Sequence, residues 1–226
     1  RSTLFPYTTL FRSPAGSNKT VELVLTALFA GIIVALAYIP FIGYIPLGFT
    51  NATTIHIPVI LGALFLGPKK GGFLGFVFGM TSMLKSTFEP TVTSFCFSPF
   101  YSLGEIHGGI GSVIICFLPR ILIGIVPFYV YKAIAGRKDS GTRSVVALGA
   151  AGIAGSMTNT ILVLGLIYVF FKDAFATVNQ VSVDAVYKVI LGIVGVNGVP
   201  EAIVAAIISV AVGKALMTRV DLYKAD

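Results

Sequence analysis

Charged residues are scarce in this sequence. Only 11% of its 226 residues are Asp, Glu, Lys or Arg, whereas 56% are hydrophobic, and the mean hydropathy is +0.94. Average proteins carry about 25% charged residues, so this composition excludes an ordinary water-soluble domain. The long apolar segments lack the alternating pattern of barrel strands, and the sequence therefore predicts an all-α integral membrane protein.

Motifs for catalysis and metal binding are also missing. The sequence contains neither a G-x-x-x-x-G-K-[ST] phosphate loop nor an H-E-x-x-H motif, and both are signatures with a known chemistry. His56 and His107 are isolated from each other, and Cys96 and Cys116 are too few for a disulfide framework. We therefore expect no enzymatic activity, no metal ion and no cofactor.

The first residues do not share the character of the rest. The stretch "RSTLFPYTTLFRS" is too short and polar to cross a bilayer, and it lacks the apolar core and the cleavage site of a signal peptide. We treat residues 1–17 as a non-native or disordered leader. Residues 18–226 are expected to form one membrane domain.

Six apolar segments follow when the chain is divided at its Gly, Pro and charge clusters. A helix needs roughly 20 apolar residues to cross the hydrocarbon core, and Pro200 is expected to divide the last segment so that a spanning helix begins near residue 199. The six predicted transmembrane segments are 20–39, 53–67, 71–85, 110–134, 143–171 and 186–217.

The basic residues indicate the orientation. Ten Lys and Arg residues lie on one side of the predicted spans and three on the other. Because cytoplasmic loops carry the excess of basic residues, both termini are predicted to be cytoplasmic. These residues sit in separate short loops, so the net charge of +7 does not indicate a nucleic-acid partner.

The predicted outer loops 1 and 3 are long. They read "PFIGYIPLGFTNATTIHIP" and "KSTFEPTVTSFCFSPFYSLGEIHGG", and both are rich in aromatic and hydroxyl side chains. Loops of this length usually have a function, and these residue types suit a pocket for a small polar molecule. An alternative is an interfacial aromatic belt, which would explain Tyr38, Tyr44, Phe100 and Tyr101 without a ligand.

Two charges lie well inside the predicted membrane region rather than near the ends of the spans. Arg120 interrupts the apolar run "SVIICFLPRILIGIVPFYV", and Glu201 directly follows Pro200. A charge at this depth usually faces the bundle interior and has a partner. Arg120 could bind the carboxylate of a ligand bidentately, with the Asn159 amide beside it. The alternative is a structural ion pair between Arg120 and Glu201.

Small residues recur every four positions on two predicted helices. Such faces allow helix backbones to approach closely, either within the bundle or at a partner. The two sets are Ala27, Gly31 and Ala35 in the first span, and Gly71, Gly75 and Gly79 in the third.

The segments "ATTIHIPVILGALFLGPKKGGFLGFVFGMTSML", "SFCFSPF" and "NGVPEAIVAAII" carry a family resemblance. On a six-span chain with a small-residue first helix, they resemble the substrate-binding S component of an energy-coupling factor (ECF) vitamin transporter. The pantothenate-specific subgroup is the most similar, over nearly all of residues 19–217.

This resemblance implies a bacterial cell-membrane protein that captures a vitamin near the extracellular face. It would dock onto a transmembrane T component that carries two cytoplasmic ATPases, and Ala27, Gly31 and Ala35 match the motif that contacts the T component. Arg120 would bind the carboxylate of pantothenate. The amide and hydroxyls would be bound by Asn159, Glu201 and polar atoms of the outer loops, for which polarity suggests Tyr44, Asn51, Thr53, Ser94 and Ser98.

Three alternatives remain. The chain could be an S component for another vitamin or precursor. A self-sufficient secondary transporter would need an internal repeat and a coupling-ion site, and the sequence indicates neither. A membrane enzyme could use Glu201 and His107 as acid and base, but these residues come from separate segments with no recognisable spacing.

Overall fold

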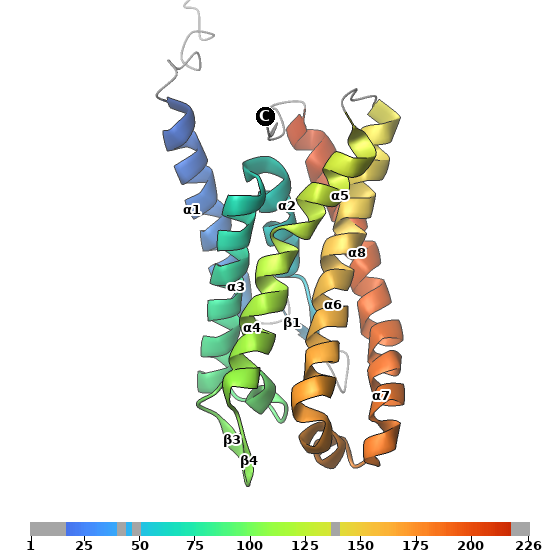
Figure 1. Ribbon diagram of the computed structural model, residues 1–226. Helices are drawn as coiled ribbons and strands as arrows, with labels where there is room; N and C mark the ends of the chain where they lie inside the picture. Colours follow the sequence, from blue (N-terminus) through green and yellow to red (C-terminus); the bar gives the residue numbers. More distant parts are fainter. Residues whose placement is uncertain (1–16, 40–43, 47–50, 137–140, 218–226) are drawn as a thin grey trace, which may run out of the picture.

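The computed structural model describes residues 17–39, 44–46, 51–136 and 141–217. The predicted leader lies outside these residues except for Ser17. Within them the chain forms a bundle whose helices run roughly side by side (Figure 1). The main helices are α1 (Ser17–Tyr38), α2 (His56–Leu66), α3 (Pro68–Phe88), α4 (Ile110–Ile123), α5 (Val126–Ala135), α6 (Gly141–Asn179), α7 (Val186–Ile193) and α8 (Val199–Met217).

Four helical stretches are long and apolar enough to cross a membrane. They are Lys19–Tyr38, Ile110–Ala135, Arg143–Asn179 and Val183–Ala215, and they match four of the six predicted spans. The predicted spans 71–85 and 53–67 correspond to α3 and α2. With 11 residues, α2 is only about 16 Å long and cannot cross the hydrocarbon core alone. The all-α membrane prediction is therefore confirmed, and the count of six crossings stays a prediction.

The predicted spans 110–134 and 186–217 each contain a break. α4 and α5 are separated at Gly124, where a Cβ atom would overlap the carbonyl of Gly71 on α3. α7 and α8 are joined by the π-helical turn η4 (Val194–Gly198). The prediction that a helix begins near residue 199 is confirmed, because α8 starts at Val199 with Pro200 in its first turn.

Two small antiparallel hairpins lie in the predicted outer loops 1 and 3. β1 (Tyr44–Pro46) pairs with β2 (Asn51–Thr53), and β3 (Ser102–Leu103) pairs with β4 (Ile106–His107). The loop before β3 also contains the 3-10 turn η2 (Ser94–Cys96). The outer loops are thus partly ordered, which apolar periodicity does not reveal.

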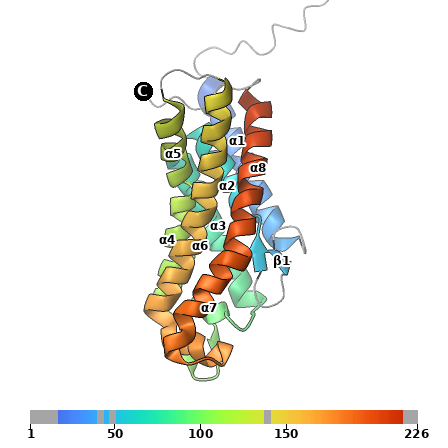
Figure 2. The same ribbon diagram turned by 90° about the vertical axis from the view of Figure 1, so that its right-hand side faces the viewer.

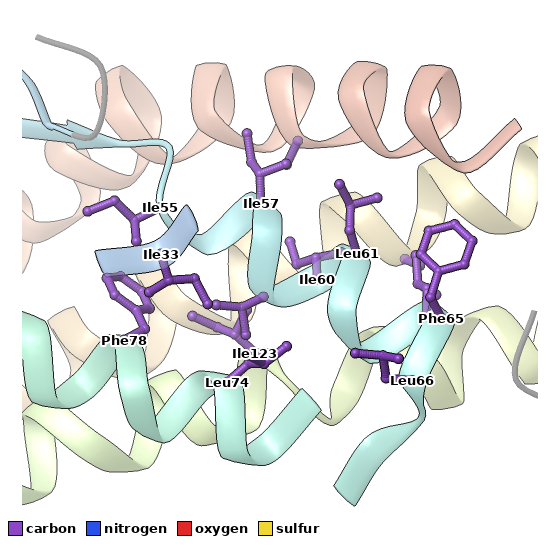
Figure 3. Packing of buried hydrophobic residues seen from close by; sticks show 14 of the residues in the cluster. Ile33, Ile55, Ile57, Ile60, Leu61, Phe65, Leu66, Leu74, Phe78 and Ile123 are labelled. Carbon is purple, nitrogen blue, oxygen red and sulfur yellow. The ribbon is translucent and has the colours of Figure 1, made fainter. Parts of the chain in front are cut away.

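α2 forms the centre of the larger hydrophobic core. Every residue of this helix is buried, and its neighbours α1, α3, α5, α6 and α8 surround it. Figure 3 shows Ile60 of α2 close to Ile33, Leu74 and Ile123 from three other helices. A second cluster packs α4, α6 and α7 against η2.

The start of α1 and the end of α8 lie at the same end of the bundle, which we call the terminal end (Figures 1 and 2). The β3–β4 hairpin and α7 lie at the opposite end, called the hairpin end. This placement agrees with an even number of membrane crossings.

Candidate substrate-binding site

A cavity of about 650 Å³ lies in the half of the bundle nearer the hairpin end. Its volume falls in the ordinary range for small-molecule sites, about 300–1,000 Å³. The walls come from β2, the loop between α3 and η2, α4, α6, α7, η4 and α8, so segments far apart in the sequence meet here. Its polar lining residues are Thr53, Thr91, Thr93, Arg120, Asn159, Thr160, Asn179, Asn197 and Glu201.

Arg120 lies on the cavity wall and is held from several directions. The residue is only 6% exposed. Its Nη1 donates a hydrogen bond of 2.7 Å to the carbonyl of Ile115. Its Cζ lies 5.1 Å from the ring centre of Phe97 and 5.5 Å from that of Phe78, within the range of cation–π attraction. The guanidinium is therefore both buried and oriented.

Two oxygen atoms of the lining have no hydrogen-bond partner among the described residues. They are Oδ1 of Asn159 and Oγ1 of Thr53, and both are buried. A buried polar atom without a partner is costly, about 1–3 kcal/mol. A polar ligand in the cavity could supply the missing hydrogen bonds.

Glu201 connects the first outer loop to α8. Its Oε1 accepts a hydrogen bond of 2.5 Å from the backbone N–H of Thr53. Both residues line the cavity. The β1–β2 hairpin is thus tied to the cavity wall through its last residue.

The other predicted loop residues are placed differently. Ser94 and Ser98 are buried but do not line the cavity. The Ser94 hydroxyl accepts a hydrogen bond from the N–H of Thr91, and the Ser98 hydroxyl bonds that of Thr87. These bonds stabilise the loop, so we do not retain either serine in the proposed site. Tyr44 and Asn51 lie in the β1–β2 hairpin, but their side chains are outside the described part of the structure.

Five polar lining residues were not predicted: Thr91, Thr93, Thr160, Asn179 and Asn197. Thr160 and Asn197 lie within apolar helical stretches, and both are buried. The same signal that identified Asn159, a polar side chain among apolar neighbours, could have found them. Thr91 and Thr93 lie in a loop full of hydroxyls, where the sequence offers no such contrast.

The rest of the cavity wall is apolar. Seven of its hydrophobic residues belong to or pack against the second core cluster: Phe97, Val163, Leu164, Ile167, Phe175, Val189 and Ile193. A mostly apolar cavity with a few convergent polar groups is typical of a site for a small organic molecule. Of the polar residues predicted from the apolar segments, Arg120 adds a cation to this wall, Asn159 an amide and Glu201 a carboxyl group.

The two small-residue faces are used differently. On α3, a Cβ at Gly71 would collide with α2 and with the break between α4 and α5, and a Cβ at Gly75 or Gly79 would collide with α4. This face therefore packs inside the bundle. On α1, Ala27, Gly31 and Ala35 are exposed, and a Cβ at Gly31 would meet nothing within 4 Å. The α1 face is therefore available to a partner or to lipid.

Similarity to known proteins shows the family of this chain. The family model described as the ECF transporter substrate-specific component matches residues 21–213. The chain is 39% identical over 165 residues to the pantothenic acid transporter PanT of Lactococcus lactis, which covers 73% of this chain and 76% of that protein. It is 28% identical over 210 residues to the pantothenate transporter PanT of Leuconostoc mesenteroides, and this match covers 89% of this chain and 94% of that protein.

These matches decide between the classes of protein considered from the sequence. The family and the relatives are transport proteins rather than enzymes. Together with the four stretches able to cross a bilayer, they identify a multi-pass bacterial membrane protein. The chain belongs to the substrate-specific S components of ECF transporters, and within them it groups with the pantothenate transporters.

Proposed function

We propose that this S component captures pantothenate in the cavity lined by Arg120, Asn159, Thr53 and Glu201. The observation that carries the proposal is the convergence of these four side chains, from four separate segments, on one cavity. The names of the two relatives supply the vitamin.

The chemistry of pantothenate suits this lining. The molecule carries one carboxylate, one amide and two hydroxyls on a branched hydrocarbon. Arg120 would bind the carboxylate, because its planar fork of donors matches two carboxylate oxygens. Asn159 Oδ1 and Thr53 Oγ1, which lack partners among the described residues, would accept hydrogen bonds from the amide and hydroxyl groups. The apolar wall would cover the hydrocarbon.

We infer further that ATP hydrolysis is supplied by partner subunits. The sequence has no phosphate loop, and the exposed face of Ala27, Gly31 and Ala35 on α1 offers a surface for a T component. Two cytoplasmic ATPases would complete the transporter, and both termini of this chain would be cytoplasmic.

The decisive experiment is calorimetric titration of the purified protein in detergent. Pantothenate is titrated beside riboflavin, thiamine, folate and biotin, and each titration is repeated with Arg120→Ala. We expect tight binding of pantothenate only, and its loss in an Arg120→Ala protein that stays monodisperse. Binding of another vitamin would retain the family but overturn the substrate.

Arg120→Ala together with Glu201→Ala tests the structural alternative. If Arg120 served only as half of an ion pair with Glu201, Arg120→Ala and Glu201→Ala would lower the melting temperature to a similar extent. Unchanged pantothenate binding in Arg120→Ala would return this residue to a structural role.

A further inference from the structure

Pro119 lies inside α4, directly before Arg120. Proline has no backbone N–H, so the helical hydrogen bond from residue 119 to the carbonyl of Ile115 cannot form. The proline ring also pushes against this carbonyl, which lies four residues earlier. The carbonyl of Ile115, in the interior of α4, therefore lacks its usual backbone hydrogen-bond donor.

The side chain of Arg120 uses this carbonyl. Its Nη1 donates to the Ile115 oxygen at 2.7 Å. Helical side chains point back toward the N-terminus of their helix, which brings the guanidinium over the preceding turn. Pro119 thus leaves the Ile115 carbonyl without a backbone donor, and the next residue, Arg120, donates a hydrogen bond to it.

Two aromatic rings also lie next to the guanidinium. Phe97 comes from the loop after η2, and Phe78 comes from α3, where it is fully buried. Phe78 reaches Arg120 because α3 and α4 lie in close contact one turn earlier: a Cβ at Gly75 would overlap the Arg120 carbonyl. This hydrogen bond and the two rings therefore help to orient a charged group that also lines the cavity.

We propose that Pro119 is a positioning residue for substrate binding. By denying the Ile115 carbonyl its helical donor, it supplies the acceptor that orients Arg120 between Phe78 and Phe97 with its fork toward the cavity. A guanidinium held in this way loses little side-chain entropy when a carboxylate binds, so preorientation increases affinity for the charged ligand. This inference rests on the proposed function, in which Arg120 binds the carboxylate.

The test compares two ligands that differ only at the carboxylate. Calorimetry measures the affinity of the intact protein for pantothenate and for the corresponding alcohol, in which CH2OH replaces the carboxylate. The ratio of the two affinities reports the contribution of the carboxylate, and a general loosening of the cavity would not change it. The variants are Pro119→Ala, Arg120→Gln and the control Pro127→Ala. Pro127 lies in the first turn of α5, where no helical hydrogen bond is lost.

In Pro119→Ala, the alanine N–H competes for the Ile115 carbonyl and draws it back into the helix. We expect the affinity ratio to fall about tenfold, the value of a hydrogen bond to a charged group, with no decrease in melting temperature, since a proline inside a helix is unfavourable. Pro127→Ala should keep the ratio. Arg120→Gln should abolish the preference for the carboxylate.

The outcomes separate the two proposals. If Arg120→Gln loses the preference while Pro119→Ala keeps the wild-type ratio, or weakens both ligands equally, the positioning role is overturned and the proposed function stands. If Arg120→Gln keeps the preference, the proposed function fails and the inference fails with it.

A second variant covers the case in which Pro119→Ala does not fold. Phe97→Leu removes one of the two rings beside Arg120 and leaves the backbone of α4 unchanged. We expect the affinity ratio to fall about threefold, as for the loss of a cation–π contact. An unchanged ratio in Phe97→Leu would then overturn the proposal.

Discussion

Asn159 is the residue whose substitution best separates binding from stability. Its Oδ1 is buried and has no hydrogen-bond partner among the described residues. Asn159→Leu removes this unsatisfied atom and keeps the volume similar, so the ligand-free protein should be at least as stable as the wild type. Pantothenate affinity should fall at least about tenfold, because the ligand loses a buried hydrogen bond. Calorimetry and thermal unfolding measure the two effects.

Ser156→Ala is the matched control for this variant. Ser156 is also on α6, and its buried hydroxyl also lacks a partner within the described ranges, but it does not line the cavity. Its substitution should leave pantothenate affinity unchanged. An equal loss of affinity in both variants would show that Asn159 acts through the packing of α6.

A second prediction at this scale concerns the thiol of Cys96 in η2. Burial raises its pKa from the ordinary value to about 12, so the reactive thiolate is scarce until the pH approaches that value. In a Cys116→Ala background, a maleimide should label Cys96 of the folded protein very slowly from pH 7 to 9. Unfolding should make labelling fast. Mass spectrometry gives the labelled fraction, and rapid labelling of the folded protein would contradict the burial of η2.

Part of the site is visible in the sequence, for a physical reason. Arg120, Asn159 and Glu201 are polar groups in apolar segments, and a polar group in lipid has to be satisfied inside the protein. The structure brings all three to one cavity. Ser94 and Ser98 could not be judged in this way, because a loop hydroxyl can equally bond its own loop. Here the Ser94 hydroxyl accepts from the N–H of Thr91, and the Ser98 hydroxyl accepts from the N–H of Phe100.

Among the elements, α1 and α3 carry the same small-residue spacing in opposite environments. A side chain at Gly75 would overlap the backbone of Arg120, whereas one at Gly31 would meet nothing. Gly75→Ala should therefore reduce the free energy of unfolding by on the order of 1–3 kcal/mol, as overpacking does. Gly31→Ala should leave it nearly unchanged.

A thiol-reactive fluorophore measures this difference, since it reports exposure of the two buried cysteines during heating. The chain has no Trp, so intrinsic tryptophan fluorescence is not an option. Equal melting temperatures for Gly75→Ala and the wild type would contradict the close contact of α3 and α4.

The positions of the elements were largely predictable from apolar runs, but their interruptions were not. Pro200 predicted the start of α8, because proline suits the first turn of a helix. The break at Gly124 depends on the approach of Gly71 from another helix, which is a tertiary contact. Likewise α2 looks like a short span in the sequence, whereas its complete burial follows only from the helices around it.

For the whole molecule, orientation in the membrane is the next property to test. The start of α1 and the end of α8 lie at the terminal end, and ten of the loop basic residues were assigned to that side. A fluorescent protein fused to the C-terminus should therefore fluoresce in bacteria, since it folds in the cytoplasm. Alkaline phosphatase fused at the same point should be inactive. The reverse result would overturn the predicted orientation.

α1 is held to α3 at both of its ends. Glu22 near its start forms an ion pair with Lys70, and Lys85 donates a hydrogen bond of 2.9 Å to the carbonyl of Ala37 near its end. The exposed face between these two ties is thus presented on a helix whose position is fixed. Neither tie involves the cavity, which lies among other elements. Substrate capture and partner docking should therefore be separable by mutation.

Gly31→Leu tests this separation, because a leucine would project from the α1 face and block a close helix contact. The variant should bind pantothenate like the wild type but fail to co-purify with the T component. Gly165→Leu is the matched control: this glycine of α6 is also exposed, and a Cβ there would also meet nothing within 4 Å. Both variants add the same side chain to an open helix surface, so general effects of the leucine cancel. Loss of the complex in Gly31→Leu alone would assign docking to α1, whereas an intact complex would remove this face from the interface.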